Sequence, residues 1–515
     1  MSSKNNNSQL RIGIILNYVN LIIGNLIPIF YTPIMLSLMG QNEYGLYKLS
    51  SSVTSYLSLI SMGLGSAVSR YLIKASTEEG REAEEKVLGL FVTIFRVISI
   101  AALVVGTAMS MSLHLWYENA LTPEELMRMK VIVLILVCNM SISFAVSPYQ
   151  SVVTSHEKFL FIQGMNILST CLGPVLNLVV LFFGGRSIEM AISTMVINVL
   201  VNFLYLCYVR RSLRIRPRYK NMPVNLMREI LKFSFWVFVA NVVGQLYNAT
   251  DTVMIGAIPA LATAGTAIYS VGATFNNIVF SLTTGVSSVM GPRTNKLVFS
   301  GGTGAELTDL AIRVGRIQGY IIALIVTGFI SFGRPFIDFY AGEGYEDAYW
   351  VAVFMMVPNM IPLVQSVCLS VIVAQNKHRF RSLVYLGIAV ANVIGTWFMM
   401  QIMGIIGAAL MTGIAVILGQ GFIMNWYYWK KTNLNMKRFW PSIGKLYLIP
   451  SGMCGITLLL SRWIDFYQLP VMIIGIVIYT VVYCILNWTM MMDDYEKNIV
   501  LEPLNKIIRK NRRQS

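Results

Sequence analysis

The chain has 515 residues, of which 56% are hydrophobic and only 12% are charged, and its formal net charge is +16 at pH 7. Soluble proteins carry about 25% charged residues, so this composition excludes a soluble protein and indicates one embedded in a membrane. The positive charge does not indicate nucleic-acid binding, because no basic and aromatic surface motif accompanies it.

Apolar segments long enough to cross a bilayer recur about fourteen times. Crossing the hydrocarbon core takes roughly 20 helical residues, and such long continuous runs are unlike the alternating pattern of a membrane β-barrel. The sequence therefore predicts an all-α membrane protein with about fourteen transmembrane helices. In order, the predicted spans are residues 12–38, 45–69, 87–113, 130–153, 158–182, 188–209, 230–257, 261–292, 310–332, 348–374, 381–400, 402–428, 445–463 and 470–492.

The basic residues are distributed unevenly among the connections between these spans. Most of the 40 lysines and arginines fall in the end segments and in alternate loops, of which residues 210–220 are the richest. Because basic loops stay in the cytoplasm, we expect both termini to be cytoplasmic. Bases beside spans also meet anionic head groups, so membrane lipids are expected partners.

Two stretches of the sequence, residues 148–177 and 362–392, resemble each other. Both carry Pro, then Gln-Ser-Val, a polar basic turn, an aromatic residue and an Asn deep in the next span. Spans one to six would then match spans seven to twelve, and an even number of spans in each repeat gives both the same orientation. This predicts two six-helix bundles related by a pseudo-two-fold axis along the membrane normal.

Two further helices follow the repeat. The predicted domains are an N-terminal six-helix bundle (1–209), a basic cytoplasmic linker (210–229), a C-terminal six-helix bundle (230–428), two additional helices (429–492) and a basic cytoplasmic tail (493–515).

Four segments carry a resemblance to a known family: residues 61–75, 248–256, 267–271 and 341–350. In this order, on this frame of spans, they resemble polysaccharide biosynthesis membrane proteins. These are the O-antigen-type flippases of the multidrug/oligosaccharidyl-lipid/polysaccharide exporter superfamily. The resemblance implies a bacterial inner-membrane protein that moves polyprenyl-diphosphate-linked oligosaccharide to the outer leaflet by alternating access, for surface polysaccharide export. It implies no cofactor, and it adds polysaccharide assembly proteins as candidate partners.

Ionisable residues within a bilayer are costly and usually face a cavity or a partner. Arg96 and Asp251 lie well inside predicted spans. A guanidinium matches phosphate oxygens two at a time, so Arg96 is a candidate contact for the diphosphate, with a structural salt bridge or bonds to carbonyls as the alternative. For Asp251 the alternative is local satisfaction by Asn248, Thr250 and Thr252.

Amide side chains at membrane depth supply the other candidate contacts. In span seven, Asn241, Gln245 and Asn248 recur at intervals of four and three residues, which places them on one helical stripe. They suit hydrogen bonding to sugar hydroxyls, and contact between helices is the alternative. The candidate cavity residues are Arg96, Asp251, Asn241, Gln245, Asn248, Asn276, Asn277 and Asn20.

Bases also end or begin spans of both repeats at the predicted cytoplasmic mouth. Topological anchoring explains most of them, while a subset would first capture the diphosphate, whose charge is costly to desolvate alone. These bases are Arg11, Arg70, Lys74, Arg293, Lys296, Arg313 and Arg316. The acidic residues after span two are predicted to form a solvated helical face; they are Glu78, Glu79, Glu82, Glu84 and Glu85.

The sequence is also compatible with other membrane functions. A membrane glycan polymerase or ligase would need a large outer loop with catalytic side chains, which the short outer loops do not offer, and no Walker or Cys/His metal pattern occurs. We therefore predict that the chain is not an enzyme and binds no metal. A cation-coupled multidrug exporter of the same superfamily is the nearer alternative, and a flippase for lipid-linked peptidoglycan precursor differs only in cargo.

Overall fold

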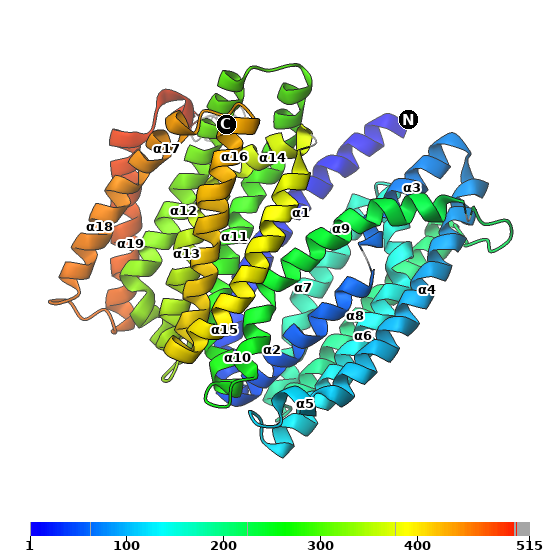
Figure 1. Cartoon of the computed structure of the whole chain (residues 1–515), viewed down its shortest axis with the longest axis horizontal. Helices are drawn as coiled ribbons and strands as arrows, with labels where there is room; N and C mark the ends of the chain where they lie inside the picture. Colours follow the sequence, from blue (N-terminus) through cyan, green and yellow to red (C-terminus); the bar gives the residue numbers. More distant parts are fainter. Residues whose placement is uncertain (1, 62, 224, 376, 499–500, 502–515) are drawn as a thin grey trace, which may run out of the picture. The chain divides into compact units, whose positions relative to one another are not determined.

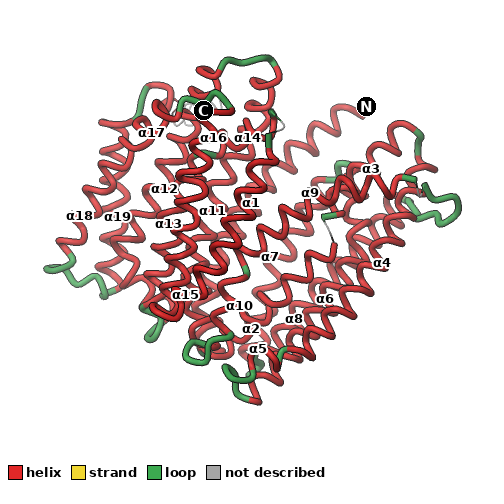
Figure 2. Tube along the Cα trace, in the orientation of Figure 1, coloured by secondary structure: helices red, strands yellow, loops and turns green. Residues whose placement is uncertain are grey.

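The computed structural model describes residues 2–61, 63–223, 225–375, 377–498 and 501. In this part of the chain the secondary structure is helical and includes no β-strand (Figure 2). The predicted all-α class is confirmed.

The helices form two compact units. Unit 1 takes in the described residues of 1–271 and 385–408, and unit 2 takes in those of 272–384 and 409–515. Helices α11 (Ala262–Phe299) and α15 (His378–Val416) contribute residues to both units. The division into sequence repeats at residues 210–229 stays a prediction.

Unit 1 contains most of the N-terminal helices (Figure 1). They are α1 (Ser2–Met39), α2 (Gln41–Ser55), α3 (Leu64–Glu78), α4 (Arg81–Ser112), α5 (His114–Tyr117), α6 (Pro123–Ser155), α7 (Phe159–Phe182), α8 (Ser187–Cys207), α9 (Leu226–Asn248) and α10 (Thr250–Gly256). The 3-10 helix η1 (Tyr56–Ser61) follows α2, and the π-helix η2 (Tyr208–Leu213) follows α8.

Unit 2 contains the remaining helices. They are α12 (Gly304–Ala341), α13 (Asp347–Val364), α14 (Ser366–Ala374), α16 (Met424–Lys431), α17 (Met436–Gly444), α18 (Leu448–Leu460) and α19 (Leu469–Leu486), with the short helices η3 (Ile417–Ile423), η4 (Lys445–Tyr447) and η5 (Asn487–Met491).

Eleven helices in the described part of the chain are long and apolar enough to cross a membrane. The predicted count of fourteen is therefore not confirmed. One candidate, residues 380–431, covers two predicted spans. The helical turns continue on both sides of Gly404, and the backbone at Gly404 itself, with a φ of 60°, forms a kink between them. The predicted span 45–69 is divided among α2, η1 and α3, and α2 and α3 have only 15 residues each.

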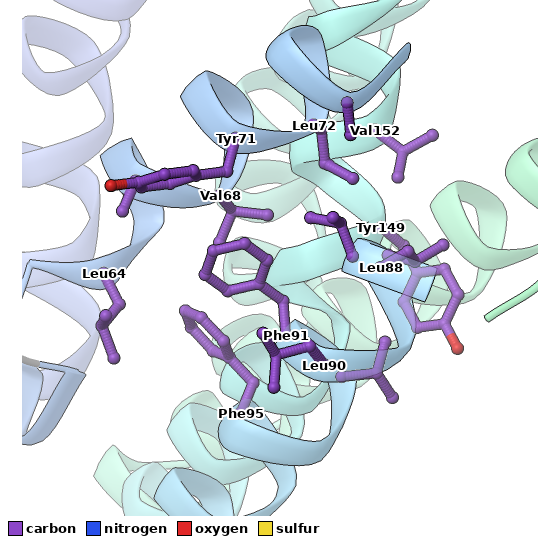
Figure 3. Packing of buried hydrophobic residues seen from close by; sticks show 14 of the residues in the cluster. Leu64, Val68, Tyr71, Leu72, Leu88, Leu90, Phe91, Phe95, Tyr149 and Val152 are labelled. Carbon is purple, nitrogen blue, oxygen red and sulfur yellow. The ribbon is translucent and has the colours of Figure 1, made fainter. Parts of the chain in front are cut away.

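A cluster of buried apolar side chains holds α3, α4 and α6 together in unit 1. Phe91 and Leu72 are fully buried, and Leu88 lies among them with Tyr149 from α6 (Figure 3). Ile215, in the segment after η2, is 2% exposed in the same cluster. The apolar face of α4 is therefore covered both by its neighbouring helices and by the start of the predicted linker.

Ion pairs fix the predicted linker to the start of α4. Glu85 accepts a 2.8 Å hydrogen bond from Nε of Arg218, and Glu84 lies 2.8 Å from Nε2 of His156. Glu84 and Glu85 are only 2% and 8% exposed. The prediction of a solvated acidic face is therefore wrong for these two residues, because neighbouring segments cover them and Arg218 and His156 contact their carboxylates.

Helix α12 is the centre of unit 2, and the two additional helices pack against it. Tyr479 on α19 donates a 2.8 Å hydrogen bond to the hydroxyl of Thr327, and Tyr483 donates a 2.7 Å bond to the Tyr320 carbonyl. Phe332 joins the aromatic side chains of the last helices in a buried cluster. Helices α18 and α19 are thus integral parts of this unit (Figure 1).

Candidate functional site

The predicted polar stripe of α9 contacts α2 and η1. Gln245 accepts a hydrogen bond from the Ser55 hydroxyl (3.2 Å) and donates one to the Ser58 hydroxyl (3.1 Å). Asn241, one turn earlier, is exposed, and the side chain of Asn248 lies outside the described residues. The amide of Gln245 therefore joins α9 to α2 and η1, while Asn241 on the same stripe is exposed.

Asp251 is a buried carboxylate in the first turn of α10. It is 2% exposed, and its Oδ2 atom accepts a 2.5 Å hydrogen bond from the hydroxyl of Tyr269 on α11. The hydroxyls of Tyr56 and Thr250 lie 2.5 Å apart in the same unit. Sequence reasoning did not indicate Tyr269 as a partner, because spacing along one helix says nothing about which neighbouring helix packs against it.

Three of the other predicted amides differ in their surroundings. Asn276 accepts a 2.9 Å hydrogen bond from Asn359 on α13 in unit 2. Asn20 accepts a 3.4 Å bond from the Thr170 hydroxyl, which joins α1 to α7 in unit 1. Asn277 is exposed. Asn20 and Asn276 thus contribute to contacts between helices, and Asn277 is accessible from outside unit 2.

Arg96 is exposed on α4. Its guanidinium carbon lies 5.4 Å from the ring centre of Tyr219, in the segment after η2. Arg96 makes none of the salt bridges found among the described residues. A cation over an aromatic face is stabilised by the ring quadrupole, and this contact does not consume the N–H donors that an anion would need.

Lys48 is another ionisable residue inside a predicted span, which sequence reasoning missed because it lies close to the start of the predicted span 45–69. It is partly buried on α2, with its ammonium 5.3 Å from the ring centre of Tyr44. It too makes none of the salt bridges among the described residues. Ser52 and Ser55, four and seven residues later, share its helical face. A cation and two hydroxyls therefore follow one stripe of α2.

The bases predicted at the cytoplasmic mouth belong to both units. Arg70 and Lys74 are exposed on α3 in unit 1, and Arg293 is exposed on α11 in unit 2. The side chain of Arg11 lies outside the described residues. In unit 2, Arg293 lines a cavity together with Lys296 and Arg313.

Arg316 has a structural role in unit 2. Its Nε atom lies 2.5 Å from a carboxylate oxygen of Glu496, and its Nη2 atom donates to the Met491 carbonyl (2.7 Å) and the Tyr320 hydroxyl (2.9 Å). Glu496 is only 4% exposed. The guanidinium of Arg316 therefore fixes the segment after α19 to α12 through its Nε and Nη2 donors.

One end of unit 1 is closely packed around the loop 257–261. The Tyr117 hydroxyl donates a 3.2 Å hydrogen bond to the Val253 carbonyl. A Cβ atom on Gly45 would lie 1.8 Å from the carbonyl oxygen of Thr263, so glycine is required there. From the distribution of basic residues we expect this to be the external end.

An apolar cavity of about 680 Å³ lies near the same end of unit 1. Its lining hydroxyls are already bonded within the wall: Tyr56 with Thr250, Tyr117 with the Val253 carbonyl, and Ser112 with the Met109 carbonyl. Apolar side chains make up most of the wall, among them Met109, Trp116, Val393, Ile394, Trp397 and Phe398. The cavity suits a hydrocarbon better than a sugar, which would need polar partners.

Among the described residues, no group of three or more His, Cys, Asp and Glu side chains is placed to hold a metal ion.

A family model described as polysaccharide biosynthesis protein matches residues 10–297, which is more than half of the chain. The chain belongs to the polysaccharide biosynthesis protein family. No curated protein sequence matches it.

This member of the polysaccharide biosynthesis protein family has the fold of solved transporters. Its structure is similar to "Lipid II flippase MurJ, inward closed conformation", with a TM-score of 0.72 and 16% identity over 93% of this chain and 100% of that one. It is also similar to a multidrug resistance MATE family transporter of the MOP superfamily in an inward-facing conformation. That match has a TM-score of 0.60 and 14% identity, and it covers 78% of this chain and 93% of that one. The match to the Vibrio cholerae MATE transporter VcmN in the bent form has a TM-score of 0.53 and 15% identity, and it covers 86% of this chain and 99% of that one. The fold is therefore that of a multi-pass membrane protein built from two helical bundles, and the predicted family and fold class are confirmed.

Proposed function

We propose that the chain flips a polyprenyl-diphosphate-linked oligosaccharide from the cytoplasmic to the outer leaflet of a bacterial inner membrane, for surface polysaccharide export. The family assignment supports a role in polysaccharide biosynthesis. A solved protein of the same fold is described as a lipid II flippase, which supports a lipid-linked cargo. Both termini are cytoplasmic in this proposal, and the chain acts by alternating access without catalysing a covalent step.

The observation that carries the proposal is the partly buried Lys48 ammonium, which lies inside the predicted span 45–69 and makes no salt bridge among the described residues. A diphosphate that enters a low-dielectric passage needs a compensating cation. Ser52 on the same face of α2 offers a hydroxyl for the sugar, whereas the Ser55 hydroxyl is already bonded to Gln245, and Asn241 on α9 offers an exposed amide. Arg96 supplies a second cation in unit 1 that has no carboxylate partner in the described structure.

The apolar cavity of unit 1 supports a lipid-linked cargo over a fully polar one. Its hydroxyls are bonded within the wall, so it offers an apolar surface to a prenyl chain. Burying apolar area in this way contributes about 25 cal/mol per Å². The hydrocarbon part of the cargo would therefore gain from contact with unit 1 while its head group is transported.

An exporter of cationic drugs would need an accessible carboxylate at depth. Asp251, the acid that lies in a predicted span, is 2% exposed and accepts a hydrogen bond from Tyr269. The cations Lys48 and Arg96 would repel a cationic drug. These surroundings favour an anionic cargo.

Replacement of Lys48 tests the proposal. In cells that lack the native protein, we expect Lys48→Ala to abolish surface polysaccharide and to accumulate lipid-linked oligosaccharide on the cytoplasmic leaflet, whereas Lys48→Arg keeps the charge and retains part of the export. The matched control is Lys86→Ala, which removes a lysine that pairs with Glu82 at 3.1 Å. This control should export normally.

Two results would count against this function. Full export by Lys48→Ala at a normal membrane level would remove the residue from the transport path. Unchanged surface glycan combined with raised sensitivity to cationic dyes in the deletion strain would favour a multidrug exporter.

A further inference from the structure

Helices α11 and α12 are longer than the hydrocarbon core of a bilayer is thick. Each has 38 residues, which corresponds to a length of about 57 Å at 1.5 Å per residue, against about 30 Å for the hydrocarbon core. They are joined by residues 300–303. The end of α11 and the start of α12 therefore lie at the level of the lipid head groups or beyond them, on the side predicted to be cytoplasmic.

A cavity of about 400 Å³ lies between these two helix ends. Arg293 and Lys296 enter it from α11, and Arg313 enters it from α12. All three side chains are exposed, and the Arg313 guanidinium lies 5.0 Å from the ring centre of Tyr495. Three cations from two helices thus surround one space.

The two carboxylates that also line this cavity are already engaged. Glu306 accepts a 2.8 Å hydrogen bond from the backbone N–H of Thr303 in a capping box. Asp309 lies 2.8 Å from Nη1 of Arg438, which adds a fourth cation next to the cavity. A carboxylate at a helix N-terminus or beside an arginine is partly neutralised. The cavity therefore keeps a net positive charge.

We propose that this cavity binds the phosphate group of a membrane lipid at the cytoplasmic surface. Basic pockets between transmembrane helices at this level bind anionic head groups, and arginine guanidinium groups match phosphate oxygens in pairs. The shared chemistry is a lipid-borne phosphate, from an anionic phospholipid or from the diphosphate of the cargo. The inference does not rest on the proposed function, because a bilayer phospholipid is a sufficient ligand.

Binding to the purified full chain tests the cavity directly. The variant Arg293→Gln/Lys296→Gln/Arg313→Gln is compared with wild type in nanodiscs of phosphatidylcholine, with labelled phosphatidylglycerol as one probe and undecaprenyl diphosphate as the other. We expect wild type to retain at least one anionic probe above the neutral background and the triple variant to lose that excess. The probe that is lost identifies the source of the phosphate.

The matched control removes three bases from the same unit that do not line the cavity, as Lys430→Gln/Lys431→Gln/Lys437→Gln. Equal losses in the control and the cavity variant would overturn the proposal, because charge alone would then explain binding. Retention of both probes by the cavity variant would overturn it too. If the triple variant does not fold, probe binding by the single variant Arg313→Gln is compared with probe binding by Lys437→Gln. If the cavity variant loses probe binding but still exports glycan normally in cells, in a manner that depends on Lys48, this site is separate from the transport function.

Discussion

Gly45 on α2 and Thr263 on α11 are in direct backbone contact within unit 1. A Cβ atom on residue 45 would lie 1.8 Å from the Thr263 carbonyl oxygen and 2.7 Å from its carbonyl carbon. Any side chain at position 45 must therefore push the two helices apart. Because α2 belongs to the first predicted repeat and α11 to the second, we expect this contact to hold the predicted external end closed only when residue 45 is glycine.

Replacing Gly45 with alanine should open this contact. Thr266, one turn along α11 from Thr263, is fully buried, so in a cysteine-free background a Thr266→Cys reporter should be labelled by an impermeant maleimide only after Gly45→Ala. The control is Gly65→Ala, whose added Cβ meets no atom within 4 Å. Equal labelling of the reporter in both glycine variants would contradict a closing role for Gly45.

Arg316 should be more important for stability than for cargo capture. Removing it leaves Glu496 buried without its cation, and the loss of one partner of a buried pair costs about 3–5 kcal/mol. We expect Arg316→Ala to lower the unfolding temperature in detergent strongly. Arg438→Ala, which breaks the exposed pair with Asp309, should cost only about 0–1 kcal/mol.

A double variant distinguishes a structural pair from a functional base. Arg316→Met combined with Glu496→Leu removes both charges, and we expect it to be more stable than either single variant. If the loss of stability in the double variant equals the sum of the losses in the two single variants, the two side chains do not act as a pair.

The charge of Asp251 should be dispensable for transport. Asp251→Asn still accepts the hydrogen bond from Tyr269, so we expect folded protein and continued glycan export. Asp251→Leu leaves the Tyr269 hydroxyl without this acceptor, which costs about 1–3 kcal/mol, and should lower the protein level in the membrane. Complete loss of export in Asp251→Asn, at a normal membrane level, would mean that an ionised carboxylate is required.

Arg96 is expected to act through its planar guanidinium. We predict that Arg96→Ala abolishes export while the protein stays in the membrane, and that Arg96→Lys recovers only part, because an ammonium cannot form the planar fork. Tyr219→Phe keeps the ring beneath the cation and should export normally. Full export by Arg96→Ala would remove this residue from the transport path.

The orientation of the chain can be measured with single cysteines. Because basic loops remain in the cytoplasm, we expect Lys220→Cys and Arg512→Cys to be protected from an impermeant reagent in intact cells. Position 512 lies outside the described residues, so only its side of the membrane is predicted. Gly344→Cys, in the loop 342–347, should be labelled. Labelling of position 220 from outside would reverse the topology.

The helical class and the family were decided by local sequence. Long apolar runs specify membrane helices wherever they fold, because a backbone in hydrocarbon must satisfy its own hydrogen bonds. The starts of α6 and α12 follow the same local logic, since Thr122 and Thr303 each form a capping box with a glutamate three residues later. The family motifs are likewise contiguous, so they can be identified without a fold.

The count of spans was predicted less well. Residues 45–69 read as one apolar helix, but the chain divides them into α2, η1 and α3. The left-handed φ of 67° at Gly63, and the approach of Val237 to within 2.5 Å of the position of its missing Cβ, show why. The break lies where α9 packs against this segment, and hydropathy along one helix contains no information about that packing.

Only the tertiary structure decided what the polar residues do. Arg316 and Glu496 are 180 residues apart in the sequence, yet they form a buried ion pair. Arg316 and Arg313 look equally suited to capture an anion when they are seen as bases at the end of a span. Packing against the segment after α19 commits Arg316 to structure and leaves Arg313 at a cavity, because a carboxylate buried by tertiary contacts must find its cation among the side chains that surround it.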